Sequence, residues 1–156
     1  MIFGKRLSEY VRFQRGVLLL TLGVGLLRLA LSLAGAPNSA VKYASMTVVM
    51  LASMIYYGVR VHTAGFGSYR HILPLLVIQG ALITTIVVAA ILLTAATGQT
   101  NIFSAPEYGG NASVPVHIAG HLVFGLVVGP LFGWAVGSLA MLVTKKVAGR
   151  RPALAA

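Results

Sequence analysis

The feature that most constrains the fold is a set of four long apolar runs, at residues 16–36, 41–61, 72–96 and 116–143. A helix needs about 20 residues to cross a hydrocarbon core of about 30 Å, and each run reaches that length. The runs are continuously apolar rather than alternating, which favours helices over the strands of a membrane barrel. We therefore predict an all-α protein, a four-helix transmembrane bundle in which residues 1–156 form a single domain.

The composition agrees with a membrane protein. Of the 156 residues, 58% are apolar and only 9% are charged. A soluble domain usually has about 25% charged residues, so this chain lacks the polar side chains that a water-facing surface needs. We expect a multi-pass integral protein, placed in a prokaryotic inner or plasma membrane.

The basic residues predict the orientation of the chain. All but two of them fall before the first run, from the end of the second run to the start of the third, or after the fourth: Lys5, Arg6, Arg12, Arg15, Arg60, Arg70, Lys145, Lys146, Arg150 and Arg151. Only Lys42 flanks the other side of the predicted spans, and Arg28 lies within one. By the positive-inside rule, both termini are cytoplasmic and residues 97–115 form an outer loop. The same charges predict contact with anionic lipid headgroups, whereas no soluble basic face exists for nucleic acid.

Residues 2–15 predict a short interfacial helix. Phe3, Leu7, Tyr10 and Val11 fall on one face of such a helix, and its basic residues lie largely elsewhere. This pattern is typical of a helix that lies on a membrane surface.

A ladder of glycines marks the last predicted span, at Gly125, Gly129, Gly133 and Gly137. Small residues at every fourth position allow two membrane helices to approach closely. We expect the ladder to pack against the first span, where Gly23 and Gly25 are also small. A homo-oligomeric seam is the alternative. Pro130 is expected to kink this helix.

Arg28 lies near the middle of the first apolar run, where a charge is costly unless something compensates it. We weigh three answers: a structural arginine satisfied by carbonyls, threonines and a carboxylate; a cationic seat for an anionic or polar ligand from outside; and a side chain that reaches the lipid headgroups.

The candidate partners of Arg28 follow from depth along the helices. Thr84 and Thr85 of the third run lie at about its level, and Gln79 lies deeper. Glu107 is the only carboxylate on the outer side, because the other acidic residue, Glu9, is predicted to be cytoplasmic. We therefore predict an outer-leaflet polar pocket around Arg28, with Glu107 folded in.

His117 and His121 lie one turn apart near the outer end of the last span, and Met46 lies at a similar depth on the second. Imidazole and thioether ligands suit copper(I) or a histidine-ligated centre, so a metal or haem site is one hypothesis for these residues. The blander interpretation is ordinary packing, because methionine commonly fills irregular cores.

Signs of catalysis are sparse. The chain has no cysteine, no paired carboxylates in one span and no glycine-rich phosphate loop, so an enzyme is disfavoured. We favour a permease-like or channel-like protein, or an accessory subunit of a larger membrane complex, forming a homo-oligomer or binding a partner membrane subunit. The alternatives are a redox or metal-binding subunit that uses His117 and His121, and a purely structural subunit.

Overall fold

The computed structural model describes residues 1–149, and this part of the chain is helical. Arg150 and Arg151 of the predicted cytoplasmic charge cluster lie outside the described residues. The elements are α1 (Leu7–Phe13), α2 (Arg15–Leu33), α3 (Asn38–Val41), α4 (Met46–Thr63), η1 (Tyr69–His71), α5 (Ile72–Thr97), η2 (Pro106–Tyr108), α6 (Val114–Val123), η3 (Phe124–Val128) and α7 (Gly129–Gly149).

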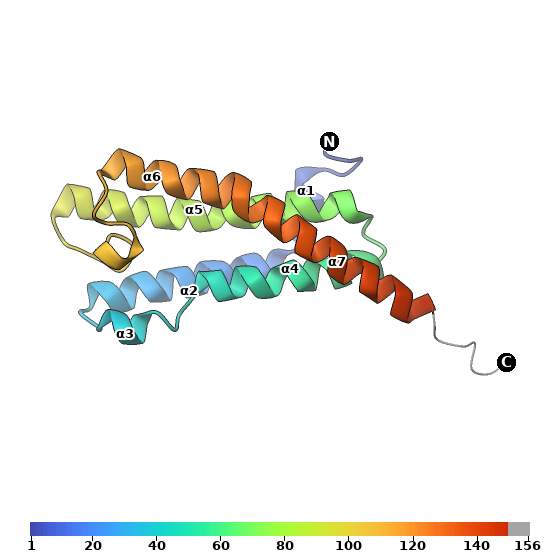
Figure 1. Cartoon of the computed structure of the whole chain (residues 1–156), viewed down its shortest axis with the longest axis horizontal. Helices are drawn as coiled ribbons and strands as arrows, with labels where there is room; N and C mark the ends of the chain where they lie inside the picture. Colours follow the sequence, from blue (N-terminus) through green and yellow to red (C-terminus); the bar gives the residue numbers. More distant parts are fainter. Residues whose placement is uncertain (150–156) are drawn as a thin grey trace.

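Four helical stretches are long and apolar enough to cross a membrane, which confirms this part of the prediction: Arg15–Leu33, Asn38–Thr63, Tyr69–Thr97 and Val114–Ala148. Four crossings return the chain to its starting side, and the N-terminus and the end of α7 lie at the same end of the bundle (Figure 1). Which side of a membrane this end faces stays a prediction.

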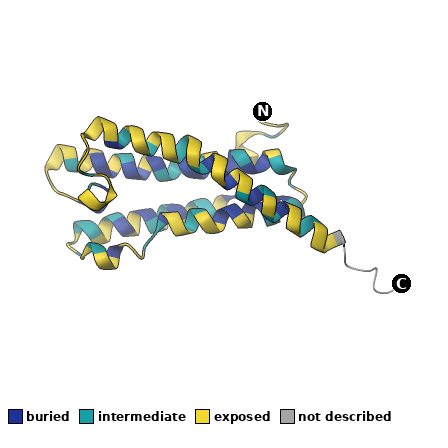
Figure 2. Ribbon diagram, in the orientation of Figure 1, coloured by how far each residue is buried: buried dark blue, intermediate teal, exposed yellow. Residues whose placement is uncertain are grey.

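Helix α5 is the centre of the bundle. It contacts α2, α4, α6 and α7, and half of its most apolar stretch is buried, compared with 17% for α2. A helix that is apolar on all sides is typical of such a central position. Figure 2 shows the difference, because α5 is largely dark while the outward faces of its neighbours are exposed. Those faces are where lipid would lie.

The last span changes neighbours halfway along. Its outer part, α6, packs on α5, and its inner part, α7, crosses to α4 (Figure 1). The π-helical turn η3 joins the two parts and ends directly before Gly129 and Pro130. Proline lacks a backbone N–H and its ring collides with the preceding turn, so a wider turn relieves the clash. The disturbance expected at Pro130 therefore takes the form of this π-turn.

The glycine ladder packs inside the chain, on partners other than those expected. A methyl group added to Gly80 of α5 would run into the carbonyl oxygen of Gly125, and one added to Gly58 of α4 into that of Gly137. A methyl added to Gly129 would meet Met50 of α4 at 2.9 Å. Within residues 1–149, α2 makes no contact with α6 or α7. The predicted pairing with the first span is therefore wrong.

The positions of the two small residues of the first span explain why the ladder does not pack against it. No atom lies within 4 Å of where a side chain at Gly23 would begin, so this glycine is on an open face. Gly25 instead faces Met46 and Ile86. Since the ladder is already occupied by α4 and α5, it lends no support to a homo-oligomeric seam.

The N-terminal helix is shorter than predicted and partly buried. It begins at Leu7, and Tyr10 is fully buried rather than facing outward. The Phe13 and Phe66 rings stack with centroids 4.0 Å apart, which docks α1 on the α4–α5 turn. Leu7 and Val11 remain exposed beside basic residues, as contact with a membrane surface would need.

Candidate functional site

The outer loop folds back into the bundle instead of remaining at its surface. Ile102 is fully buried and Phe103 nearly so, and both belong to a core cluster with Met46 of α4 and Ile86 of α5. Sequence reasoning missed this insertion. The apolar pair between polar neighbours was the available signal.

Hydrogen bonds fix the inserted loop on two helices. The Asn101 side chain donates to the carbonyl oxygen of Ala90 and to the Thr94 hydroxyl, both at 2.8 Å. The backbone N–H of Ile102 donates to Ser32 Oγ of α2 at 2.8 Å. These bonds satisfy backbone and amide groups that would otherwise be unpaired in an apolar setting, so the loop has a defined position.

Arg28 lies directly beneath this loop. Its guanidinium carbon is 5.3 Å from the ring centres of both Phe103 and Tyr108, and the residue is only 7% exposed. Its Nε has no hydrogen-bond partner, and no carboxylate lies within 4.0 Å of the side chain, in the described part of the chain. Cation–π contacts stabilise a charge by about 0.5–2 kcal/mol. That is less than a buried, unpaired charge costs.

Glu107 is not the partner of Arg28. Its side chain is exposed and accepts a hydrogen bond from Asn38 Nδ2 at 2.8 Å, which ties the loop to α3. The backbone N–H of Glu107 itself and then Asn38 hold the pKa of this carboxyl below its ordinary value. The expected ion pair is therefore absent among residues 1–149, because a water-facing amide already holds the carboxylate.

The other predicted pocket residues are dispersed. The Thr85 hydroxyl is bonded to its own helix at Ala81 O, 2.8 Å away. The Thr84 hydroxyl lies at the α5–α6 seam, 3.5 Å from His121 O. Gln79 is fully buried in the inner half of the bundle. None of these three accepts a hydrogen bond from Arg28.

Gln79 belongs to a second polar group, the inner cluster, which is defined by Gln14, Thr21, Ser53, Tyr57 and Gln79. Gln79 Nε2 donates to Thr21 Oγ1 at 3.2 Å and to Ser53 Oγ at 3.0 Å. One turn away, the Tyr57 hydroxyl donates to Gln14 Oε1 at 2.7 Å. All five side chains are buried, and Gln14 Nε2 and Gln79 Oε1 have no partner in the described residues. Each such atom costs about 1–3 kcal/mol.

A periodic signal could have revealed this arrangement. Gln14, Thr21 and Arg28 are spaced by seven residues, which is about two helical turns. Thr21 and Arg28 therefore share one face of α2, and Gln14 caps the start of this helix. Between the polar positions lies Gly25, where an added methyl would lie 2.6 Å from Met46 Sδ and 2.9 Å from Ile86 Cδ1. An apolar layer therefore separates Arg28 from the inner cluster.

The two histidines face each other. His117 Nε2 and His121 Nε2 are 3.1 Å apart, a distance that one hydrogen bond between the rings explains. Among residues 1–149, no third histidine, cysteine or carboxylate joins them in a ligand set. Met46 is packed on Gly25 and Ile86 instead. Of the three candidate ligands, His117 and His121 therefore lie together and Met46 lies apart, and the copper or haem site stays a prediction.

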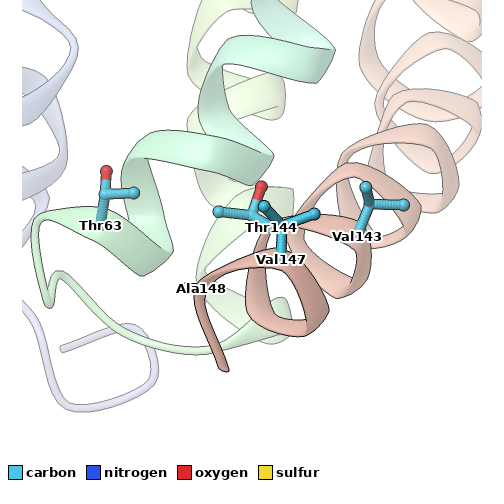
Figure 3. Close-up of a pocket in the computed structure, with 5 residues that line it drawn as sticks. All are labelled: Thr63, Val143, Thr144, Val147 and Ala148. Atoms are coloured by element: carbon cyan, nitrogen blue, oxygen red, sulfur yellow. The ribbon is translucent and has the colours of Figure 1, made fainter. Parts of the chain in front are cut away.

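An apolar groove of about 370 Å³ opens at the other end of the bundle, between the ends of α4 and α7 (Figure 3). Thr63, Val143, Thr144 and Val147 line it. The Thr144 hydroxyl is bonded to Ala140 O, and none of the described residues that line the groove is charged. Lipid chains suit such a surface.

Comparison of the chain with protein-family models, with curated proteins and with solved structures finds no match.

Proposed function

We propose that this protein is a small permease-like membrane protein that receives a small carboxylate anion from the outer side at Arg28. The observation that supports the proposal most directly is the burial of the Arg28 side chain, which has no carboxylate within 4.0 Å and no hydrogen-bond partner for its Nε among the described residues. The planar fork of donors on arginine matches a carboxylate in geometry and charge. A bound anion would supply the negative charge and the hydrogen-bond acceptors that the surrounding chain does not offer to Arg28.

The loop above Arg28 covers the guanidinium with two aromatic rings, and these rings control the access of an anion to it. Phe103 is held in the core, whereas Tyr108 is 38% exposed and lies on the short η2 segment. Gly109 follows in a left-handed conformation, with φ of 98°, which glycine adopts without strain. In this proposal the exposed Tyr108 ring is the one that moves aside to admit an anion, while the buried Phe103 stays in place.

The experiment is thermal unfolding of the purified protein in a neutral detergent, with rising sodium acetate at constant ionic strength. A ligand that binds only the folded state raises its stability with concentration. Acetate should stabilise the wild type, and Arg28→Gln should remove that effect. The matched control is Lys42→Gln, which neutralises an exposed cation beside α3 and should respond as the wild type does.

The same experiment also separates this proposal from an arginine whose side chain reaches the lipid headgroups. If Arg28 only contacts lipid headgroups, Arg28→Gln is neutral or stabilising, and acetate has the same effect on both proteins. That outcome would contradict the proposed function.

A further inference from the structure

The inner cluster has a hydrogen-bonding capacity that its own residues do not use. The Ser53 hydroxyl donates its single proton to Val49 O at 2.6 Å, so the Gln79 atom 3.0 Å from Ser53 Oγ is the amide nitrogen. This fixes the orientation of the Gln79 amide and leaves its oxygen without a donor.

Gln14 shows the opposite deficiency. The Tyr57 hydroxyl donates to Gln14 Oε1, so the amide nitrogen of Gln14 is left without an acceptor. Both glutamines are at most 1% exposed. The inner cluster therefore has one free acceptor and one free donor, and it contains no charge.

We propose that the inner cluster is a second solute site in the same chain, and that it and Arg28 together select a small carboxylate that also carries a hydroxyl group. The inference rests on the proposed function. Arg28 offers only donors, which suit the carboxylate. The inner cluster offers a donor for a carboxylate oxygen and, at Gln79 Oε1, an acceptor for the hydroxyl.

The position of the cluster supports a route rather than two unrelated sites. Thr21 and Arg28 share one face of α2, and the apolar layer at Gly25 lies between the two polar sites. Flexible side-chain ends of Met46 and Ile86 form that layer, so rotation of these side chains opens it. A site without charge also releases an anion readily, as conduction requires.

The test uses the full chain in proteoliposomes and radiolabelled glycolate, the smallest hydroxycarboxylate. Uptake should be saturable and inhibited at least tenfold more strongly by unlabelled glycolate than by acetate, which lacks the hydroxyl. Gln79→Met, of similar volume, should lower uptake at least tenfold while the Arg28-dependent acetate binding is kept. Thr21→Val is a second variant of the same cluster, in case Gln79→Met does not fold.

Matched controls exist for each change. Thr85→Val removes a hydroxyl that is bonded to its own helix and should leave uptake unchanged. Gly25→Ala should reduce uptake because the added methyl crowds Met46 and Ile86, whereas Gly23→Ala, on the open face of α2, should not.

Four results would overturn the inference. Equal uptake by Gln79→Met, Thr21→Val and wild type would remove the inner cluster from the route. Equal inhibition by acetate and glycolate would show that the inner cluster does not select for the hydroxyl group. Arg28-dependent acetate binding without any uptake would reject the route and the permease-like role but leave the anion site at Arg28 standing. Absence of that binding in the wild type would reject both the anion site and the inference.

Discussion

The guanidinium carbon of Arg28 lies 5.3 Å from the centre of the Phe103 ring, and this contact joins the buried charge of α2 to the outer loop. Phe103 is in turn positioned by Asn101, whose Oδ1 accepts from the Phe103 backbone N–H at 2.9 Å. The loop and the charge therefore form one structural unit, and a change in either should affect the other.

Asn101→Ala should destabilise the folded protein by about 2 kcal/mol. The change removes two side-chain hydrogen bonds and leaves the buried N–H of Phe103 unpaired. Thermal unfolding in detergent measures the loss. Asn111→Ala, at an exposed position of the same loop, is the control and should have little effect. Equal stability of the two variants would show that Asn101 does not hold the loop.

Gly80→Ala should be more damaging than its size implies, with a loss of several kcal/mol typical of overpacking. The added methyl would meet the backbone oxygen of Gly125, and a backbone cannot rotate away as a side chain can. The same substitution at Gly23 meets no atom within 4 Å and should be tolerated. Comparison of their unfolding temperatures tests the α5–α6 contact, and two unchanged values would contradict it.

Acid should loosen the outer loop. The pKa of Glu107 is held below its ordinary value of 4.5, first by its own backbone N–H and then by Asn38. A lowered pKa means that the carboxylate stabilises the fold fully above about pH 4.5 and that this contribution is lost as the pH falls through the lowered pKa. Hydrogen exchange in the loop should therefore rise on acidification.

Glu107→Gln is the control for the acid response, because it removes the titrating group. Exchange in this variant, corrected for the intrinsic rate, should depend less on pH than in the wild type. An identical pH dependence in the two proteins would show that the Asn38–Glu107 contact does not hold the loop.

Impermeant labelling of single cysteines tests the orientation. The chain has no native cysteine, so substitutions at Asn38 and Asn111 should react from outside intact cells, and one at Ser68 should not. A further position, Ala153, lies outside the described residues and is expected to behave like Ser68. The reverse pattern would place Arg28 in the inner leaflet and overturn the proposed direction of entry.

The spans could be predicted from the sequence because length and apolarity alone decide them. The partners of each span could not, because Gly23 and Gly25 look alike in the sequence but face open space and the core respectively. Arg28 was recognisable in the sequence because it is a charged residue inside an apolar run, which is also why its burial is costly. The contact between Arg28 and Phe103 could not be predicted. The insertion of the loop depends on hydrogen bonds between residues far apart in the sequence, such as Ile102 and Ser32.

The most direct test of the central claim is a measurement of acetate binding to Arg28. Saturation-transfer NMR on the acetate methyl protons detects this binding. The wild type in neutral detergent should give a saturable signal that excess formate displaces. The signal should be lost in Arg28→Gln, weakened in Arg28→Lys, which keeps the charge but not the fork of donors, and kept in Lys42→Gln. A signal of equal strength in the wild type and Arg28→Gln, or none in the wild type, would contradict an anion site at Arg28.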